Sequence, residues 1–144
     1  MYPIVYRIAV RVAGMTVLGA TLLASATALH AAELAGSEWQ PAVIGEILVP
    51  SDMDIFVRFE PAGKLNGHGG CNRFLGTYRI SGSRVEICPL AATRMACPES
   101  VMNTETDFVR ALETAKRFKR DRTDLDLLDE NDVVVITLTQ RDAD

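Results

Sequence analysis

The sequence predicts an α+β fold: a mainly antiparallel β-sheet, strongly curved or barrel-like, with one helix inserted between strands. Most of residues 37–139 alternates apolar and polar side chains with the period of a β-strand. One stretch, at 98–115, follows the period of a helix instead. The connections between these stretches are short, which favours antiparallel pairing. In a chain of 144 residues we expect a single domain, at 33–144.

The first 32 residues have the composition of a secretory signal peptide. They contain no Asp or Glu, and their only strong cations are Arg7 and Arg11. An uncharged apolar stretch follows at 12–24, and small residues dominate 25–32. A basic start, an apolar middle and a small-residue end predict export, with cleavage after Ala28, Ala31 or Ala32. The protein is therefore expected to be periplasmic or secreted.

A membrane anchor is the competing interpretation of the same segment. The uncharged stretch at 12–32 is long enough to span a bilayer. Its content of Ala, Thr, Ser and Gly, and the absence of a basic cluster after it, favour cleavage. No cysteine lies near the cut, so attachment of a bacterial lipid to a cysteine is not expected. Membrane contact is expected only through an uncleaved signal segment.

The first half of the domain is predicted to form four strands, at 37–43, 54–60, 74–80 and 84–87. The first carries the only tryptophan, Trp39. Turns are expected at 61–64 and at 81–83, and the second of these joins two strands as a hairpin. Glycines at 67, 69 and 70 allow positive φ or close backbone approach, so they predict a bend before the third strand.

One helix follows, and three strands complete the domain. Pro98 suits a first helical turn. The residues at helical spacing are Val101, Met102, Glu105, Phe108, Leu112 and Ala115. Acidic residues lie early in this stretch and basic residues late, as the helix dipole favours. The later strands are predicted at 117–122, 125–128 and 133–139, with a hairpin at 129–132.

The charge of the domain argues against a nucleic-acid partner. Removing residues 1–32 leaves 112 residues that keep all 19 acids and 13 of the 15 Lys and Arg, a formal charge of −6. Binding to phosphate backbones needs clustered cations. The one basic run, at 116–122, is followed by acids at 124–132, and we interpret it as a solvated strand. Its alternative is an anion-binding patch.

Two chemical sites can be considered around the cysteines Cys71, Cys88 and Cys97. A thiol enzyme would use Cys71 or Cys97 with His68, but that histidine is expected on a flexible turn with nothing to hold its ring. A zinc site would use His68 and all three cysteines, but the paired Cys-x-x-Cys spacing of zinc sites is absent. A phosphate loop fails, because no Lys-Ser/Thr follows the glycines. We predict no catalytic residue, no metal and no cofactor.

The stretch GGCNRFLGTYRI, at 69–80, is better explained as a structural corner. The short amide of Asn72 can satisfy a neighbouring backbone group at a bend. Cys71 can enter the apolar layer as a small residue or as half of a disulfide. An exported chain meets oxidising conditions, where cysteines tend to pair. Three cysteines allow three different pairs, and each pair leaves one thiol.

Two motifs in this sequence resemble the META/HslJ domain family. The first is GHGGCNRFLGTY at 67–78, and the second is LAATRMACP at 90–98, just before the helix. Trp39 also stands where these domains usually carry a tryptophan. The resemblance covers about residues 35–140. The matching residues that we single out are Gly70, Asn72, Phe74, Gly76, Tyr78, Thr93, Arg94 and Met95.

The resemblance implies a small α+β domain, often exported or lipid-anchored in bacteria, without an established catalytic activity or cofactor. The family is associated with heat shock, stress response and antibiotic tolerance. Cys71 and Cys97 lie inside the two motifs and Cys88 lies outside them, so the resemblance favours a Cys71–Cys97 disulfide. We therefore expect a noncatalytic, monomeric domain of the cell envelope that binds a protein or another envelope component. A thiol- or zinc-dependent activity is the alternative.

Overall fold

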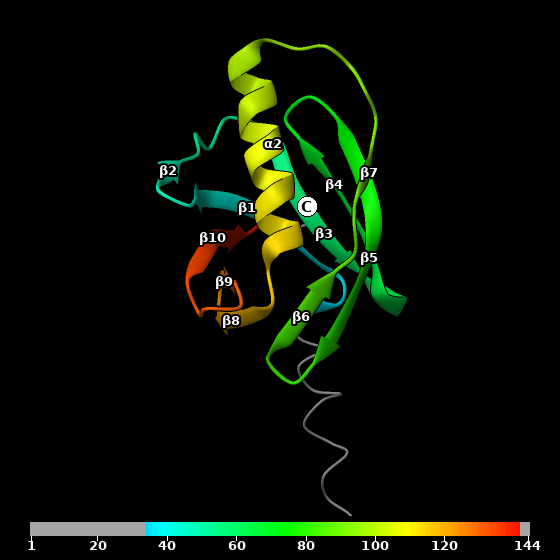
Figure 1. Cartoon of the computed structure of the whole chain (residues 1–144), viewed down its shortest axis with the longest axis vertical. Coiled ribbons are helices and arrows are strands. Elements are labelled where there is room, and N and C mark those ends of the chain that lie inside the picture. The colour runs from blue at the N-terminus through cyan, green and yellow to red at the C-terminus, as the bar shows by residue number, and fades with distance from the viewer. Residues whose placement is uncertain (1–33, 142–144) are drawn as a thin grey trace, which may run out of the picture.

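In the computed structural model, which describes residues 34–141, eight antiparallel strands close into a barrel (Figure 1). In barrel order they are β1 (Ser37–Ile44), β3 (Ile55–Glu60), β4 (Lys64–Gly69), β5 (Arg73–Ser81), β6 (Arg84–Ile87), β8 (Arg117–Asp121), β9 (Asp124–Leu128) and β10 (Val134–Gln140). Pairing of β10 with β1 closes the ring. The predicted barrel-like antiparallel sheet with one inserted helix is thus confirmed.

Smaller elements complete the described chain. β2 (Ile47–Leu48) pairs with β1, and β7 (Ala91–Ala92) pairs with β5. A short 3₁₀ turn, η1 (Pro61–Gly63), joins β3 to β4. The helix α2 (Glu99–Thr114) contacts β1, β4, β6 and β10, which belong to different sides of the ring. It therefore lies across the barrel and covers its interior.

Side chains of the strands and the helix fill the barrel. Trp39 is fully buried, and its Nε1 donates a hydrogen bond to Ser37 Oγ over 2.7 Å. From the helix, Phe108 and Leu112 are fully buried. The ring of Phe108 meets that of Phe74 edge to face, with centroids 5.8 Å apart. The interior is thus a packed core rather than an open channel.

The predicted bend at the glycines 67, 69 and 70 is wrong in part, because residues 64–69 form the strand β4 between β3 and β5. Gly70 alone of the glycines at 67, 69 and 70 has a positive φ, at 100°. Gly67 is needed for close approach: a Cβ there would lie 2.2 Å from the Phe56 carbonyl oxygen and 2.4 Å from Phe74 Cζ. The missing side chain gives the Phe74 ring its place against β4.

Further differences from the sequence prediction are small. Pro98 precedes the helix instead of standing in its first turn, and its carbonyl oxygen accepts from the backbone N–H of Val101 and Met102. Met102, one of the residues at helical spacing, is 39% exposed. β2 and β7 were not predicted, because each has only two residues.

The predicted signal peptide at 1–32 lies outside the described residues. None of the described helices is both long and apolar enough to cross a bilayer.

Candidate functional site

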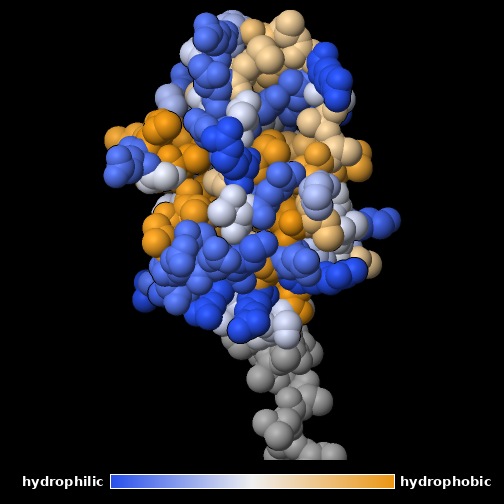
Figure 2. Space-filling view, viewed as in Figure 1, coloured by the Kyte–Doolittle hydropathy of each residue, from blue (hydrophilic) through white to orange (hydrophobic). Residues whose placement is uncertain are grey.

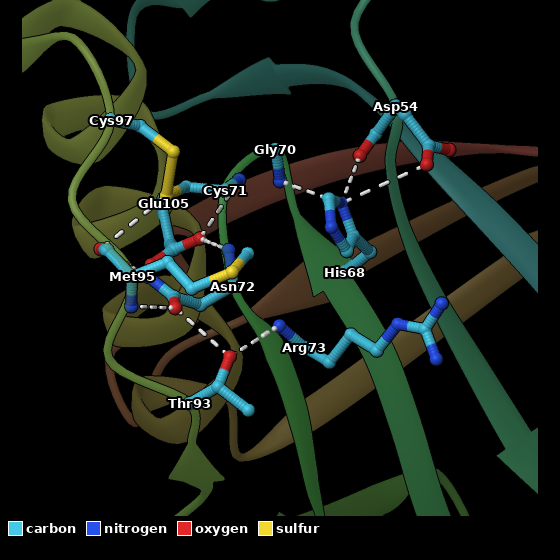
Figure 3. Close-up of a disulfide and its surroundings, with 10 residues drawn as sticks. All are labelled: Asp54, His68, Gly70, Cys71, Asn72, Arg73, Thr93, Met95, Cys97 and Glu105. Atoms are coloured by element: carbon cyan, nitrogen blue, oxygen red, sulfur yellow. Dashed lines mark hydrogen bonds and ion pairs between the residues drawn. A yellow bond between two sulfur atoms is a disulfide. The ribbon is translucent and has the colours of Figure 1, made fainter.

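The two motif stretches meet at one corner of the barrel, where the turn from β4 to β5 lies beside the start of α2 (Figure 3). The first stretch supplies the turn residues Cys71 and Asn72. The second runs past them on its way into the helix and supplies Thr93, Met95 and Cys97. Residues that lie more than 20 positions apart in the sequence are therefore in direct contact.

Asn72 is the centre of this corner, and its side-chain amide is fully used. The residue is 4% exposed. Its Oδ1 accepts hydrogen bonds from the Met95 backbone N–H over 2.7 Å and from Thr93 Oγ1 over 2.9 Å. Its Nδ2 donates to Glu105 Oε1 over 2.7 Å and to the Met95 carbonyl oxygen over 3.4 Å. The amide thus binds β5, the second motif and the helix together.

Glu105 reaches from α2 to the turn. Its Oε2 accepts from the backbone N–H of Asn72 over 2.5 Å and from that of Cys71 over 3.2 Å. Gly69 makes room for this carboxylate, because a Cβ at Gly69 would lie 2.4 Å from Glu105 Cγ. The turn therefore has its backbone donors satisfied by a charged acceptor, which is a strong form of hydrogen bond.

The disulfide joins Cys71 to Cys97, with Cα atoms 6.0 Å apart, so this is the pair that the resemblance favours. It ties the turn after β4 to the residue just before Pro98, where the helix begins. Cys88 is a half-buried free thiol. With both motif sulfurs in the disulfide, neither offers the thiolate that nucleophilic catalysis or zinc binding requires.

His68 does not assemble with these sulfurs into a site. The sequence predicted a flexible turn at His68, but the residue lies on the strand β4. Its Nδ1 lies 2.7 Å from the Asp54 carbonyl oxygen and 3.1 Å from the Gly70 nitrogen, and its ring stacks on Phe56. Among the described residues no group of three or more His, Cys, Asp or Glu side chains could hold a metal ion.

The other motif residues are mostly structural. Phe74 and Tyr78 are buried, and Tyr78 Oη donates to the Glu60 carbonyl oxygen over 3.0 Å. Burial, followed by the charge of Glu60, raises the pKa of Tyr78 above its ordinary value. Gly76 faces Leu90, whose Cδ2 lies 2.6 Å from a Cβ built there. Arg94 and the side chain of Met95 are exposed, although the backbone of Met95 belongs to the corner.

One functional residue of the corner, Glu105, was not recognised from the sequence. The sequence placed it among the apolar residues at helical spacing but gave it no partner. The signal that could have found it is a carboxylate on an otherwise apolar helix face, because a buried charge needs a partner. Within the described chain, no buried side-chain nitrogen or oxygen lacks a hydrogen-bond partner. The buried polar side chains of the corner are therefore all hydrogen-bonded within the fold.

Exposed apolar side chains gather away from the corner, around a groove between the β1–β2 turn, α2 and the start of β10. We call these residues the apolar surface: Ile47, Leu48, Val133 and Val134. Their exposed fractions run from 42% at Val134 to 80% at Leu48. Figure 2 shows orange, hydrophobic atoms over β2 and β10 at the edge of the molecule.

Comparisons with known proteins identify a matching domain family and solved structures with a similar fold. A model of the META domain family matches residues 32–142. The chain is similar to an NMR structure of a protein from Burkholderia xenovorans, with 20% identity, a TM-score of 0.63, and coverage of 92% of this chain and 100% of that chain. It is also similar to a crystal structure of a DUF4847 family protein from Bacteroides vulgatus, with 19% identity, a TM-score of 0.54, and coverage of 77% and 96%. These two likenesses show a shared fold. The comparison with curated proteins finds no match.

Proposed function

This chain belongs to the META domain family, and we propose that it is a noncatalytic, monomeric domain of the cell envelope that binds a protein or another envelope component during stress. One observation carries the proposal. The buried amide of Asn72 is bonded to Thr93 and Glu105, while four of the seven large apolar side chains that are exposed among the described residues gather on a separate surface. The motif accordingly maintains the fold, and binding falls to the apolar surface.

The apolar surface has the character of a contact site for a protein. Ile47 and Leu48 stand on a small hairpin that turns at Gly45, and they are 55% and 80% exposed. Val133 and Val134 continue the surface at the start of β10. Contiguous exposed apolar side chains on a soluble domain mark interaction sites, because their burial against a partner is favourable.

Capture from the native envelope, with and without heat or antibiotic stress, tests the proposal. The variant Leu48→Asp places a charge on the apolar surface, and its side chain is too exposed for the fold to depend on it. The matched control is Leu75→Asp, on β5, where the leucine is 65% exposed outside that surface. A protein retained by the wild type and by the control, but lost by Leu48→Asp, supports the proposal. Equal retention by all three, or no retained component in any condition, contradicts it.

The alternative of a thiol- or zinc-dependent activity has a separate test. In the structure, two of its four donors, Cys71 and Cys97, are bonded to each other. Metal analysis of the purified mature chain, kept oxidised and unreduced, is therefore expected to give far less than one zinc per chain. Stoichiometric zinc would favour the alternative and require a reduced corner.

A further inference from the structure

We infer that a groove at the junction of β6 and β8 binds a small phosphate-bearing ligand. The groove is lined by Arg79, Ile80, Ser81, Arg84, Val85, Glu86, Lys116, Arg117 and Glu130. It shares no residue with the apolar surface or with the disulfide corner. The inference is therefore independent of the proposed envelope function, and each can fail without the other.

The groove exists because β6 and β8 pair only briefly. Their register holds a single pair, Arg84 opposite Arg117, whereas β8 and β9 share five pairs. Two backbone hydrogen bonds flank this point, from Val85 N to the Lys116 carbonyl oxygen and from Phe118 N to the Ser83 carbonyl oxygen. Beyond them the two strands diverge, and the barrel wall is hollowed down to Ile80, which is half-buried, and Val85, which is only 2% exposed.

The charges around this groove are unusual for a strand pair. Two arginines directly opposite each other on neighbouring strands repel. Arg117 forms an ion pair with Asp132, in which Arg117 Nη1 lies 2.8 Å from Asp132 Oδ1. Arg79 Nη1 lies 3.9 Å from Glu86 Oε2. Arg84 and Lys116 pair with no carboxylate among the described residues. Arg84 and Lys116 thus line the same groove without a carboxylate at ion-pair distance, although Glu130 also lines it.

Such a pair of cations suits an oxyanion. A guanidinium offers a planar fork of N–H donors that matches two phosphate oxygens, and a lysine ammonium adds a point charge beside it. The half-buried side chain of Ile80, at the floor of the groove, can contact a short carbon portion of the ligand. The face over β8 and β6 presents mainly hydrophilic side chains, with hydrophobic atoms between them (Figure 2). The overall negative charge of the domain favours a small ligand over a polyanion.

The same chemistry occurs in soluble phosphate monoesters and in anionic lipid headgroups, so the experiment includes both. Nitrogen-15 NMR spectra of the mature chain are recorded during titration with inorganic phosphate and with phenyl phosphate. Flotation with vesicles of phosphatidylglycerol, and with vesicles of phosphatidylcholine as a control, tests the lipid source. We expect saturable shifts of the amides at 84–85 and 116–117, larger and at lower concentration with phenyl phosphate. Flotation with phosphatidylglycerol alone would assign the ligand to a lipid headgroup.

The decisive variant removes the two uncompensated cations, as Arg84→Gln with Lys116→Gln. Its matched control, Arg73→Gln with Lys119→Gln, removes the same charge from exposed positions outside the groove. We expect the first variant to weaken phenyl phosphate or vesicle binding by about tenfold or more, and the control by no more than about twofold. Equal weakening in both variants would show a general charge effect and overturn the inference, as would shifts confined to other residues or no binding by any probe.

Thermal unfolding provides a readout that does not depend on comparing affinities. Removal of the repulsion between Arg84 and Arg117 should leave the Tm of the Arg84→Gln, Lys116→Gln variant unchanged or raised without ligand. Phenyl phosphate should raise the Tm of the wild type and the control but not that of this variant, because a ligand stabilises only the state that binds it. A variant that unfolds at a clearly lower Tm without ligand would show that these cations are structural, and would contradict the inference.

Discussion

Asn72 is the single residue on which the corner depends most, because its amide both donates and accepts across three segments. The change Asn72→Asp keeps the size and shape of the side chain but replaces the Nδ2 donor with a carboxylate oxygen. That oxygen would face Glu105 Oε1, now 2.7 Å from Nδ2. We expect the free energy of unfolding to fall by about 3 kcal/mol, because two carboxylates would be forced together in a nearly buried site. Urea denaturation measures this.

Asn66→Asp is the matched control for that prediction. Asn66 Nδ2 also donates to a glutamate, Glu60 Oε1, over 3.2 Å, but the pair lies in a more accessible part of β4. Water screens charges there, so a loss of less than about 1 kcal/mol is expected. Losses of similar size in both variants would mean that the Asn72 network contributes no more than an ordinary surface contact.

Asp129 gives a pH-dependent prediction. Its Oδ1 accepts from the backbone N–H of Val133 and Asn131, over 2.9 Å and 2.8 Å. The bond from Val133 is the main cause that lowers the pKa of Asp129 below its ordinary value; desolvation opposes it, and the bond from Asn131 adds to the lowering. A lowered pKa in the folded state means that the charged form stabilises the fold. This contribution is complete above the pKa of the unfolded chain and is lost as the pH falls through that of the folded chain.

The variant Asp129→Asn should therefore have a lower Tm than the wild type at about pH 7, and the difference should vanish near about pH 2. Circular dichroism melts at both pH values measure it. Asp124→Asn, at the exposed start of β9, should change the Tm less at about pH 7. A difference for Asp129→Asn that persists at low pH would point to the shape of the loop rather than to the charge.

For single residues, the sequence predicted the role of a side chain but not the residue that it contacts. The amide of Asn72 was expected to satisfy backbone groups at a bend, and it does so at Met95. The contact with Glu105 could not be predicted, because helical spacing places a residue on a face without saying what lies opposite. The same holds for Gly67, whose need for space depends on a Phe74 ring seven positions along the chain.

Among the elements, the helix start is held to the barrel by the Cys71–Cys97 disulfide, which closes a loop from 71 to 97. In the chain-entropy model a loop of this length is worth about 3.5 kcal/mol, a large share of the stability of a typical domain. We expect Cys71→Ser with Cys97→Ser to lower the free energy of unfolding by about this amount. Reducing agent should destabilise the wild type similarly and leave the double variant unchanged.

Cys88→Ser is the control, because Cys88 is a half-buried free thiol. It should cost much less than the double change and should keep its sensitivity to reducing agent. Peptide mapping without reduction should recover the Cys71 and Cys97 peptides linked. A linkage through Cys88, or free thiols at both motif cysteines, would contradict the pairing. Loss of partner binding in a folded Cys71→Ser, Cys97→Ser variant would show that the corner is also a binding site.

Most elements could be predicted, since alternation and helical period are local properties of the chain. β4 could not, because three of its six residues at 64–69 are Asn or Gly, which are depleted in strands. Its stability comes from its position between β3 and β5, with six and five register pairs to these neighbours. Tertiary pairing there overrides local propensity, which no single segment of the sequence reveals.

For the whole molecule, barrel closure depends on β1, which pairs with β3 through residues 37–39 and with β10 through residues 39–44. The sequence predicted a curved sheet, but strand order needs information on pairing that alternation does not carry. Closure also explains why the surfaces differ. Closure leaves the short β2 hairpin outside the ring, where it carries part of the apolar surface. It also leaves a weak junction between β6 and β8 within the ring, where the groove with Arg84 and Lys116 lies.

The start of the folded domain bears on the predicted export. Leu34 is fully buried, and its carbonyl oxygen accepts from Ser37 Oγ over 2.5 Å, so the folded domain needs the chain from this residue onward. The predicted cleavage of the acid-free segment at 1–32 is therefore expected to fall before Leu34. We expect mass spectrometry of the protein from its own host to find an N-terminus between Leu29 and Glu33. A product that starts further into the domain would remove Leu34 from the core and contradict the prediction. An intact Met1 in a membrane-embedded product would also contradict it, because the segment would then be an anchor.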